Sequence, residues 1–445
     1  MSALPGTAAA TSAALRSFEA AWRARPADPL AAMRAQSMHR FLALGLPTAR
    51  DESWRYTNLR TIAARSFVDA PRIGAGAAAP ATAAQSWLAG PGMAVIRIVN
   101  GYPEIGDAAD RPDAPFAVRS LGSILAHDPG FLAARMAPVE DLDEGRWALL
   151  NRALFVDGLY LRITGRVAAP MLIVHAANST GENFAIHSRL IVEAAPGAEA
   201  TIIEHHLGPA AHPVLANQAT QIDLEAGAAI EHFRVFSGDD RTAHFDALDL
   251  RQAANSRCRQ FTIVLGGALV RADLRVRLGA TGATHESYAL LVGHDARHVD
   301  CVNTIVHAAS RTHSTQTARA IGAGTSRVVF NSKVIVDRGT VGAQSRQSCR
   351  SLLLSPTAEV DTRPQLEIHA DDVQCAHGAT TGRLDPDMLF YLLSRGIERP
   401  AAQSLLIYAF LDDVLTGISS APARRAIEDA LIAQLPDADL LRTFR

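Results

Sequence analysis

Apolar residues recur along this chain with two different periods, and the changes between them divide it into segments. Leu15, Phe18 and Trp22 lie three or four residues apart, the spacing that places side chains on one face of an α-helix. From residue 158 to about residue 374, apolar residues instead form short runs broken by glycine, which is typical of strands and tight turns. Helical spacing then returns and continues toward the C-terminus. The pattern predicts a β-rich core between two helical segments.

Residues 1–92 are predicted to form an N-terminal helical domain with a linker. Trp54 and Tyr56 stand among charged residues, and on composition alone we expect them to pack against the end of a helix. Residues 71–91 are rich in Ala, Pro and Gly, which predicts the linker or an exposed loop. Residues 93–157 are predicted to be a mixed α/β connection into the core.

Residues 158–382 are predicted to form that core. Its short strands recur at loosely regular intervals, and segment 193–205 resembles segment 225–232. Repetition of strand, glycine turn and strand favours a β-solenoid, in which each coil buries its apolar residues against the next. A sandwich or a large barrel is the structural alternative. The predicted fold is mainly β, a right-handed parallel β-helix (β-solenoid) flanked by N-terminal and C-terminal α-helical domains. Its clearest strands are LYLRI (159–163), PMLIVHA (170–176), SRLIVEA (188–194), TQIDLEA (220–226), QFTIVLG (260–266), DLRVRLG (273–279), SYALLVG (287–293) and SRVVFNSKVIVD (326–337).

Residues 383–445 are predicted to form a C-terminal helical domain. Asp385 begins its first helix as the N-cap, and Gly396 ends that helix. A second helix carries Leu406 and Phe410 on one stripe, and a third runs to about residue 436. These apolar stripes exceed what three short helices can bury against one another. We therefore expect a partner surface on this domain.

Cys375 and His377 lie two residues apart near the end of the predicted core. On a strand they would project from the same face, with their Cα atoms about 6.6 Å apart. If Leu366 and Ile368 face inward, strand parity turns Cys375 and His377 outward, although Asp371-Asp372 can break the register. A thiolate and an imidazole suit one metal centre, but two ligands cannot hold an iron–sulfur cluster, which takes about four. The structural alternative is a buried cysteine beside a hydrogen-bonded histidine.

Composition excludes several classes of function. The 43 Lys+Arg residues are balanced by 45 Asp+Glu, so no basic surface points to nucleic acid. No apolar run approaches the roughly 20 residues that a membrane span needs. The N-terminus lacks the charged and apolar regions of a secretory signal. The four cysteines include no C-x-x-C pair and predict neither a disulfide framework nor a zinc ribbon. A reducing, cytoplasmic location fits this usage best.

The sequence lacks any recognisable enzyme constellation. It has no Walker A loop, no nucleophile elbow and no dinucleotide fingerprint. Its histidines lack the fixed spacing of a zinc motif, so we expect surface or ladder residues and no dedicated zinc site; the candidates are Glu204-His205-His206, His294, His298 and His307. The alternative function is that of a β-helix polysaccharide lyase or esterase, which uses paired acids. The carboxylates that would imitate such a site, expected on the solvated face, are Asp223, Glu225, Asp246 and Asp249.

Five short motifs in a fixed order resemble one known family. They are WRYT (54–57), LEI (366–368), DVQCAHGAT (372–380), LFYL (389–392) and SRGI (394–397). Together they resemble the SufB/SufD family of iron–sulfur cluster assembly proteins. The Cys-x-His-Gly-Ala-Thr form resembles the SufD branch, since SufB proteins have Glu-His-Glu-Ala-Thr at this point. The resemblance covers the layout of the whole chain.

The resemblance implies a non-catalytic scaffold of the SUF iron–sulfur cluster assembly complex. SufD-like proteins pair with SufB through their β-helices, and each C-terminal helical domain docks one copy of SufC, which hydrolyses ATP. His377 matches the interface histidine proposed to ligate a nascent, transient Fe–S cluster together with a SufB cysteine. Cys375 is its neighbour in the same motif. The candidate SufC-docking residues on the C-terminal helices are Phe390, Tyr391, Arg395, Leu406 and Phe410.

The resemblance also bears on cofactors and assembly. The family complex has been associated with a reduced flavin, which no motif places on this chain. The resemblance implies no nucleic-acid or membrane partner. The sequence leaves open whether the chain also forms a homodimer when SufB is absent.

Overall fold

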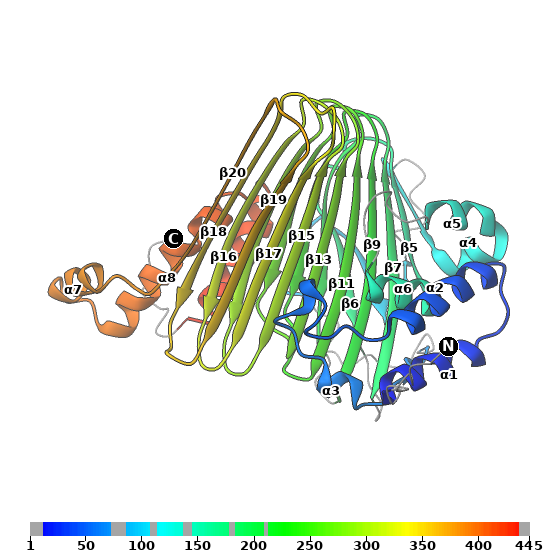
Figure 1. Ribbon diagram of the computed structural model, residues 1–445, viewed down its shortest axis with the longest axis horizontal. Coiled ribbons are helices and arrows are strands. Elements are labelled where there is room, and N and C mark those ends of the chain that lie inside the picture. The colour runs from blue at the N-terminus through cyan, green and yellow to red at the C-terminus, as the bar shows by residue number, and fades with distance from the viewer. Residues whose placement is uncertain are drawn as a thin grey trace, which may run out of the picture.

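The computed structural model describes residues 12–72, 86–106, 114–136, 145–177, 183–208 and 212–435. A long β-solenoid occupies its centre, with helices at both ends of the chain (Figure 1). Most of the predicted linker, residues 73–85, lies outside the described residues, as does the predicted end of the third C-terminal helix near residue 436.

The solenoid consists of two ten-stranded sheets, sheet A and sheet B, and consecutive strands from β5 onward alternate between them. Each coil therefore contributes one strand to each sheet, and successive coils pair in parallel. Sheet A contains β1 (Val68–Asp69), β4 (Phe116–Ser120), β5 (Asp157–Ile163), β7 (Phe184–Ala194), β9 (Val214–Leu224), β11 (Thr242–Gln252), β13 (Leu269–Leu278), β15 (His298–His307), β17 (Arg327–Val336) and β19 (Glu359–Ile368). Sheet B contains β2 (Ala94–Val99), β3 (Tyr102–Glu104), β6 (Met171–Ala176), β8 (Glu199–His206), β10 (Ala229–Phe236), β12 (Arg257–Val264), β14 (Thr284–Gly293), β16 (His313–Gly322), β18 (Ala343–Leu353) and β20 (Val373–Gly382).

Aligned aliphatic residues hold the coils together. Side chains at matching positions of successive parallel strands stack in the interior, and burying one Val, Leu or Ile there contributes about 1.5–3 kcal/mol. Such a ladder in sheet A comprises Val192, Ile222, Leu250, Val276, Ile305, Val334 and Leu366. This packing of coil against coil confirms the predicted β-solenoid and excludes the sandwich and the barrel.

The internal repeat seen in the sequence corresponds to two successive coils. Gly197 and Gly227 adopt left-handed φ values of 68° and 71°, which favour glycine. The Gly197 N–H donates a hydrogen bond to the Ala226 carbonyl, and the Gly227 N–H donates one to Ala254 in the next coil. The same turn is therefore used again one coil later.

Most of the helices before β5 pack around one end of the solenoid (Figure 1), while Glu52 of the 3-10 helix pairs with Arg363 on β19. Trp54 was expected to pack against a helix end, but its ring lies on sheet A, with the Arg271 guanidinium 4.2 Å from the ring centroid. The Thr57 hydroxyl donates to Asp300 and lies 2.9 Å from His298 Nε2. The helices are α1 (Ala13–Ala24), α2 (Ala31–Leu44), the 3-10 helix η1 (Glu52–Trp54), α3 (Arg60–Ala63), α4 (Leu121–His127), α5 (Pro129–Arg135) and α6 (Arg146–Leu154).

The C-terminal helices are α7 (Pro386–Ser394), α8 (Arg399–Leu415) and α9 (Ala421–Ile432). The outer face of sheet B carries stacked rings, with 4.6 Å between the centroids of Phe233 and Phe261 and 4.7 Å between those of Phe261 and Tyr288. The apolar stripes of α8 and α9 pack against this face, through residues such as Leu411 and Ile427. The surplus apolar surface expected on these helices is therefore largely covered by the solenoid of the same chain.

Candidate functional site

The strand β20 is the last strand of sheet B and carries both Cys375 and His377. It pairs in parallel with β18, and no described strand pairs with its other edge. Its backbone N–H and C=O groups on that edge are therefore available for pairing with another chain. We call the end of the solenoid formed by β19 and β20 the open end.

The register of β20 places Cys375 and His377 on the interior side of the solenoid. Cys375 aligns with Ser345 and His377 aligns with Gln347, and both of these β18 residues are buried. Aligned residues of parallel neighbours point to the same face, and Cys375 indeed packs against the interior cluster of apolar side chains. The expectation that the pair faces outward is therefore wrong, because the chain turns between β19 and β20. His377 is nevertheless exposed, since it stands on the last coil.

Cys375 differs from the other three cysteines in its environment. It is half-buried, and burial raises the pKa of its thiol while a hydrogen bond with the Ser345 backbone opposes the shift. Cys258, Cys301 and Cys349 are buried in the solenoid, and burial raises the pKa of Cys301 to about 12 and that of Cys349 to about 11. A cysteine binds a metal as the thiolate. Because Cys375 is the least buried of the four, it is the best placed to bind a metal.

A row of interior polar side chains leads to His377. Gln347 Nε2 donates to Ser332 Oγ at 2.7 Å, and Ser332 Oγ donates to Gln316 Oε1 at 2.8 Å. Asn303 Nδ2 also donates to Gln316 Oε1, at 3.2 Å. His377 occupies the next position after Gln347 in this row. Sequence patterns could not reveal the row, because its members come from four different strands.

Among the candidate docking residues, those of α7 are the most exposed. Phe390 is 71% exposed and Tyr391 is 56% exposed, and no residue of α7 is buried. Arg395 is exposed and its guanidinium lies 5.2 Å from the centre of the Tyr391 ring. Leu406 and Phe410 are half-buried on α8, and Phe410 packs against the solenoid. Figure 1 shows α7 extending away from the two sheets.

The histidines expected as surface or ladder residues lie mostly in the interior or under other elements. His206 and His307 are buried between the sheets, and His205 is buried beneath Trp87 on the outside of sheet B. His298 lies under the Thr57 segment, and His294 is half-exposed beside Asp295. Sequence reasoning missed one arrangement: His175 on β6 meets Glu204 and His206 on β8. Only the alignment of two coils brings these three together.

The surface carboxylates are paired with arginines instead of with one another. Asp223 binds Arg251, Asp249 binds Arg275 and Glu225 binds Arg162. Asp246, expected on the solvated face, is buried in the interior and binds Arg234. Two free carboxylates facing a sugar are what a polysaccharide lyase or esterase would need, and these ion pairs do not supply them.

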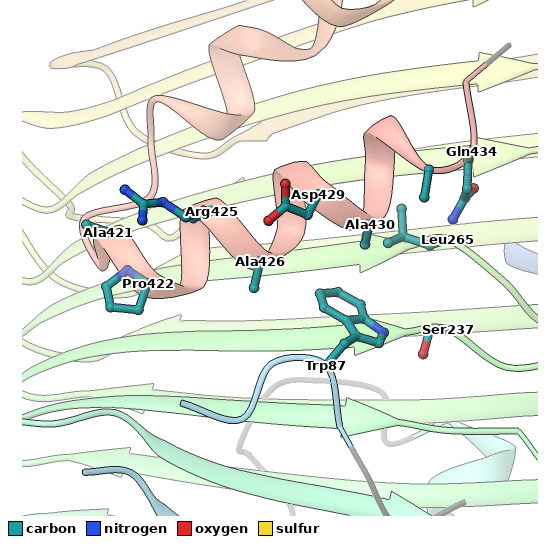
Figure 2. Close-up of a pocket in the computed structure, with 11 residues that line it drawn as sticks. Trp87, Ser237, Leu265, Ala421, Pro422, Arg425, Ala426, Asp429, Ala430 and Gln434 are labelled. Atoms are coloured by element: carbon teal, nitrogen blue, oxygen red, sulfur yellow. The ribbon is translucent and has the colours of Figure 1, made fainter. Parts of the chain in front are cut away.

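A groove of about 900 Å³ lies between α9 and Trp87. Figure 2 shows the Trp87 indole facing the alanines of α9, with Arg425 and Asp429 above it. The described lining contains no histidine or cysteine. Most of the residues that line the groove are apolar, and none of them belongs to the open end.

Comparisons with known proteins agree with this architecture. Residues 175–410 match the family described as "SUF system FeS cluster assembly, SufBD core domain". The iron–sulfur cluster assembly protein SufD of Escherichia coli is 28% identical over 90% of this chain and 92% of its own length. A SufBD family protein of Synechocystis is also 28% identical, over 84% of each chain. None of the described helices is long and apolar enough to cross a membrane. The family match covers more than half of the chain and includes most of the solenoid. The chain therefore belongs to the SufBD family of iron–sulfur cluster assembly proteins.

Proposed function

We propose that this protein is a SufD-type scaffold subunit that pairs with SufB and docks the ATPase SufC, while a nascent Fe–S cluster is built at the SufB interface. The observation that carries the proposal is the position of Cys375 and His377, two residues apart on a terminal strand whose second edge pairs with no described strand. The scaffold itself is non-catalytic, and ATP hydrolysis occurs in SufC. Four free cysteines fit the reducing cytoplasm in which such a complex would work.

The open end suits strand-by-strand pairing with a homologous solenoid. Its free strand edge offers backbone hydrogen bonds, and Ile368, which is 41% exposed, offers apolar area. A partner solenoid placed there would cover Cys375 and His377 and provide the remaining ligands. A cluster held by ligands from two chains can be released when the chains move apart, which suits a cargo better than a resident cofactor.

SufC is proposed to dock on α7. The Asp385 carboxylate caps the N-terminus of this helix by accepting from the Asp387 and Met388 N–H groups, and no residue of the helix is buried. Large exposed apolar side chains grouped on one helix are typical of a partner surface. Phe390 and Tyr391 are the proposed anchors, with Arg395 beside them.

The test is co-expression of this chain with SufB and SufC, followed by purification and measurement of iron and sulfide per complex. His377→Ala should leave the complex intact and lower the cluster content. The matched control is His369→Ala, since His369 is also exposed near the open end but bonds to Glu367. Full cluster content in His377→Ala, or an equal loss in His369→Ala, would refute the ligand role.

The docking proposal is tested in the same co-expression. The double substitution Phe390→Ser and Tyr391→Ser should remove SufC from the purified complex and leave SufB bound. Val341→Ser is the control, because Val341 is 51% exposed on a turn of the solenoid. Retention of SufC by the double variant would place its docking elsewhere.

A further inference from the structure

A group of titratable side chains lies inside the solenoid, far from the open end. His175 on β6 and Glu204 and His206 on β8 each offer one ligand atom, and these atoms lie within 4.8 Å of one another. All three residues are buried. β8 and β20 are separated by six coils in sheet B, so this group is distinct from Cys375 and His377.

The carboxylate of Glu204 is held in one orientation by its neighbours. His175 Nε2 lies 2.9 Å from Glu204 Oε2, and His232 Nε2 lies 2.9 Å from Glu204 Oε1. The Thr220 hydroxyl donates to the same carboxylate at 3.0 Å. These contacts occupy both oxygens of the Glu204 carboxylate and fix its plane. Such fixing by neighbouring groups is what orients ligands in metal sites.

Unlike the Glu204 carboxylate, the ring nitrogens of His206 are buried without hydrogen bonds. Neither Nδ1 nor Nε2 has a hydrogen-bond partner among the described residues. Its ring is fixed between the rings of His175 and Phe236, with centroids 4.5 Å away on each side. A buried polar atom without a partner costs about 1–3 kcal/mol.

A carboxylate faces His206 across a gap that suits an ion. His206 Nε2 and Asp246 Oδ2 are 3.9 Å apart, too far for a hydrogen bond. Two metal–ligand bonds of about 2.0–2.2 Å span such a distance. Asp246 Oδ2 has no hydrogen-bond partner among the described residues, because Arg234 binds the other oxygen. A cavity of about 10 Å³ beside the group is lined by His175 and His244, but not by Glu204, His206 or Asp246.

We propose that the interior of the solenoid binds one divalent transition-metal ion through His175, Glu204 and His206, with Asp246 as a fourth ligand. Two imidazoles and a carboxylate are the ligand set of zinc sites and of non-haem ferrous sites. The ion would satisfy the orphaned nitrogen of His206 and the orphaned oxygen of Asp246 together. It would also join β6, β8 and β11 inside the solenoid.

The experiment is a titration of the purified, EDTA-treated full chain with Co²⁺, followed by visible absorption and by metal content after desalting. The expected result is one equivalent of Co²⁺ with ligand-field bands that Zn²⁺ displaces. His206→Phe preserves the ring stack but removes the nitrogens, and it should abolish the bands. Glu204→Gln, which keeps the shape of the side chain, should weaken binding by roughly 10–100-fold. Circular dichroism checks that each variant is folded.

Two controls separate this site from other metal ligands in the chain. The double variant Cys375→Ser and His377→Ala should bind Co²⁺ as the wild type does. His205→Phe removes a neighbouring buried imidazole that faces Ser86 and Ser237 on the outside of sheet B, and it should also retain the bands. Absence of bands in the wild type overturns the proposal, and this holds even if the interior variants fail to fold. Bands that survive in folded His206→Phe, or that disappear in the double variant, overturn it as well.

Discussion

The buried ion pair between Arg234 and Asp246 is the interior contact whose loss should be most costly. Both side chains are 0% exposed, and Arg234 Nη1 donates to Asp246 Oδ1 at 2.5 Å. Arg234 also donates to the Asp273 carbonyl at 3.0 Å and to Thr262 Oγ1 at 2.9 Å. Arg234→Met removes all three hydrogen bonds and keeps most of the side-chain volume.

The expected loss in the free energy of unfolding is about 3–5 kcal/mol, because Asp246 would remain buried without a countercharge. Burial raises the pKa of Asp246, and Arg234 is the strongest group that opposes the shift. In the variant, the folded-state pKa of Asp246 should rise further above its unfolded value. Protonation then relieves the cost, so the loss should be larger at pH 8 than at pH 5.

Urea unfolding followed by far-UV circular dichroism, with EDTA present, measures this loss. In the double variant Arg234→Met and Asp246→Leu, the loss in the free energy of unfolding should be smaller than the sum of the losses in the two single variants by at least about 2 kcal/mol. Arg23→Met is the control, because Arg23 is 70% exposed in its pair with Glu19, and it should cost less than about 1 kcal/mol. A loss below about 1 kcal/mol in Arg234→Met, or strict additivity in the double variant, would refute the reasoning.

Three further predictions concern acid stability, a close backbone approach and the N-terminal segment. Burial lowers the pKa of His187 to about 3, so the folded state resists protonation of this side chain. The free energy of unfolding should therefore be unaffected by His187 above about pH 6.5 and should fall by about 1.4 kcal/mol per pH unit between about pH 6.5 and pH 3. Urea midpoints that stay constant from about pH 7 to pH 4 would contradict this. Gly158→Ala should abolish soluble expression or cost more than about 3 kcal/mol, because the added Cβ would overlap the Arg189 carbonyl oxygen, far closer than van der Waals contact allows. An unchanged melting temperature would rule out this clash. Trp54→Ala should lower the free energy of unfolding by about 3–5 kcal/mol, because the Trp54 ring packs over Arg271. The chain around Trp54 should then be cleaved faster in limited proteolysis, and a cleavage rate equal to that of the wild type would argue against this packing.

The sequence contained enough local information to predict the solenoid. Short β-branched runs separated by glycine turns specify coils, and the repeat at 193–205 and 225–232 proved to be one turn used twice. Asp385 and Gly396 set the limits of α7 through local capping, which depends only on neighbouring residues. Cys375 and His377 could be singled out because they lie in one short motif.

Tertiary structure alone decided which way these residues face and what they meet. The chain turns between Ile368 and Val373, so the strand parity carried forward from Leu366 did not apply to Cys375. In the sequence, the apolar stripes of α8 and α9 had no evident partner. Their partner is sheet B, and most of its strands lie more than a hundred residues earlier in the chain. His175 and His206 meet because β6 and β8 pair in parallel, coil upon coil. The spacing of apolar residues within one segment indicates whether that segment is a strand. Which residues of two coils meet depends on the lengths of all the strands and turns between them, and no short stretch of sequence contains that information.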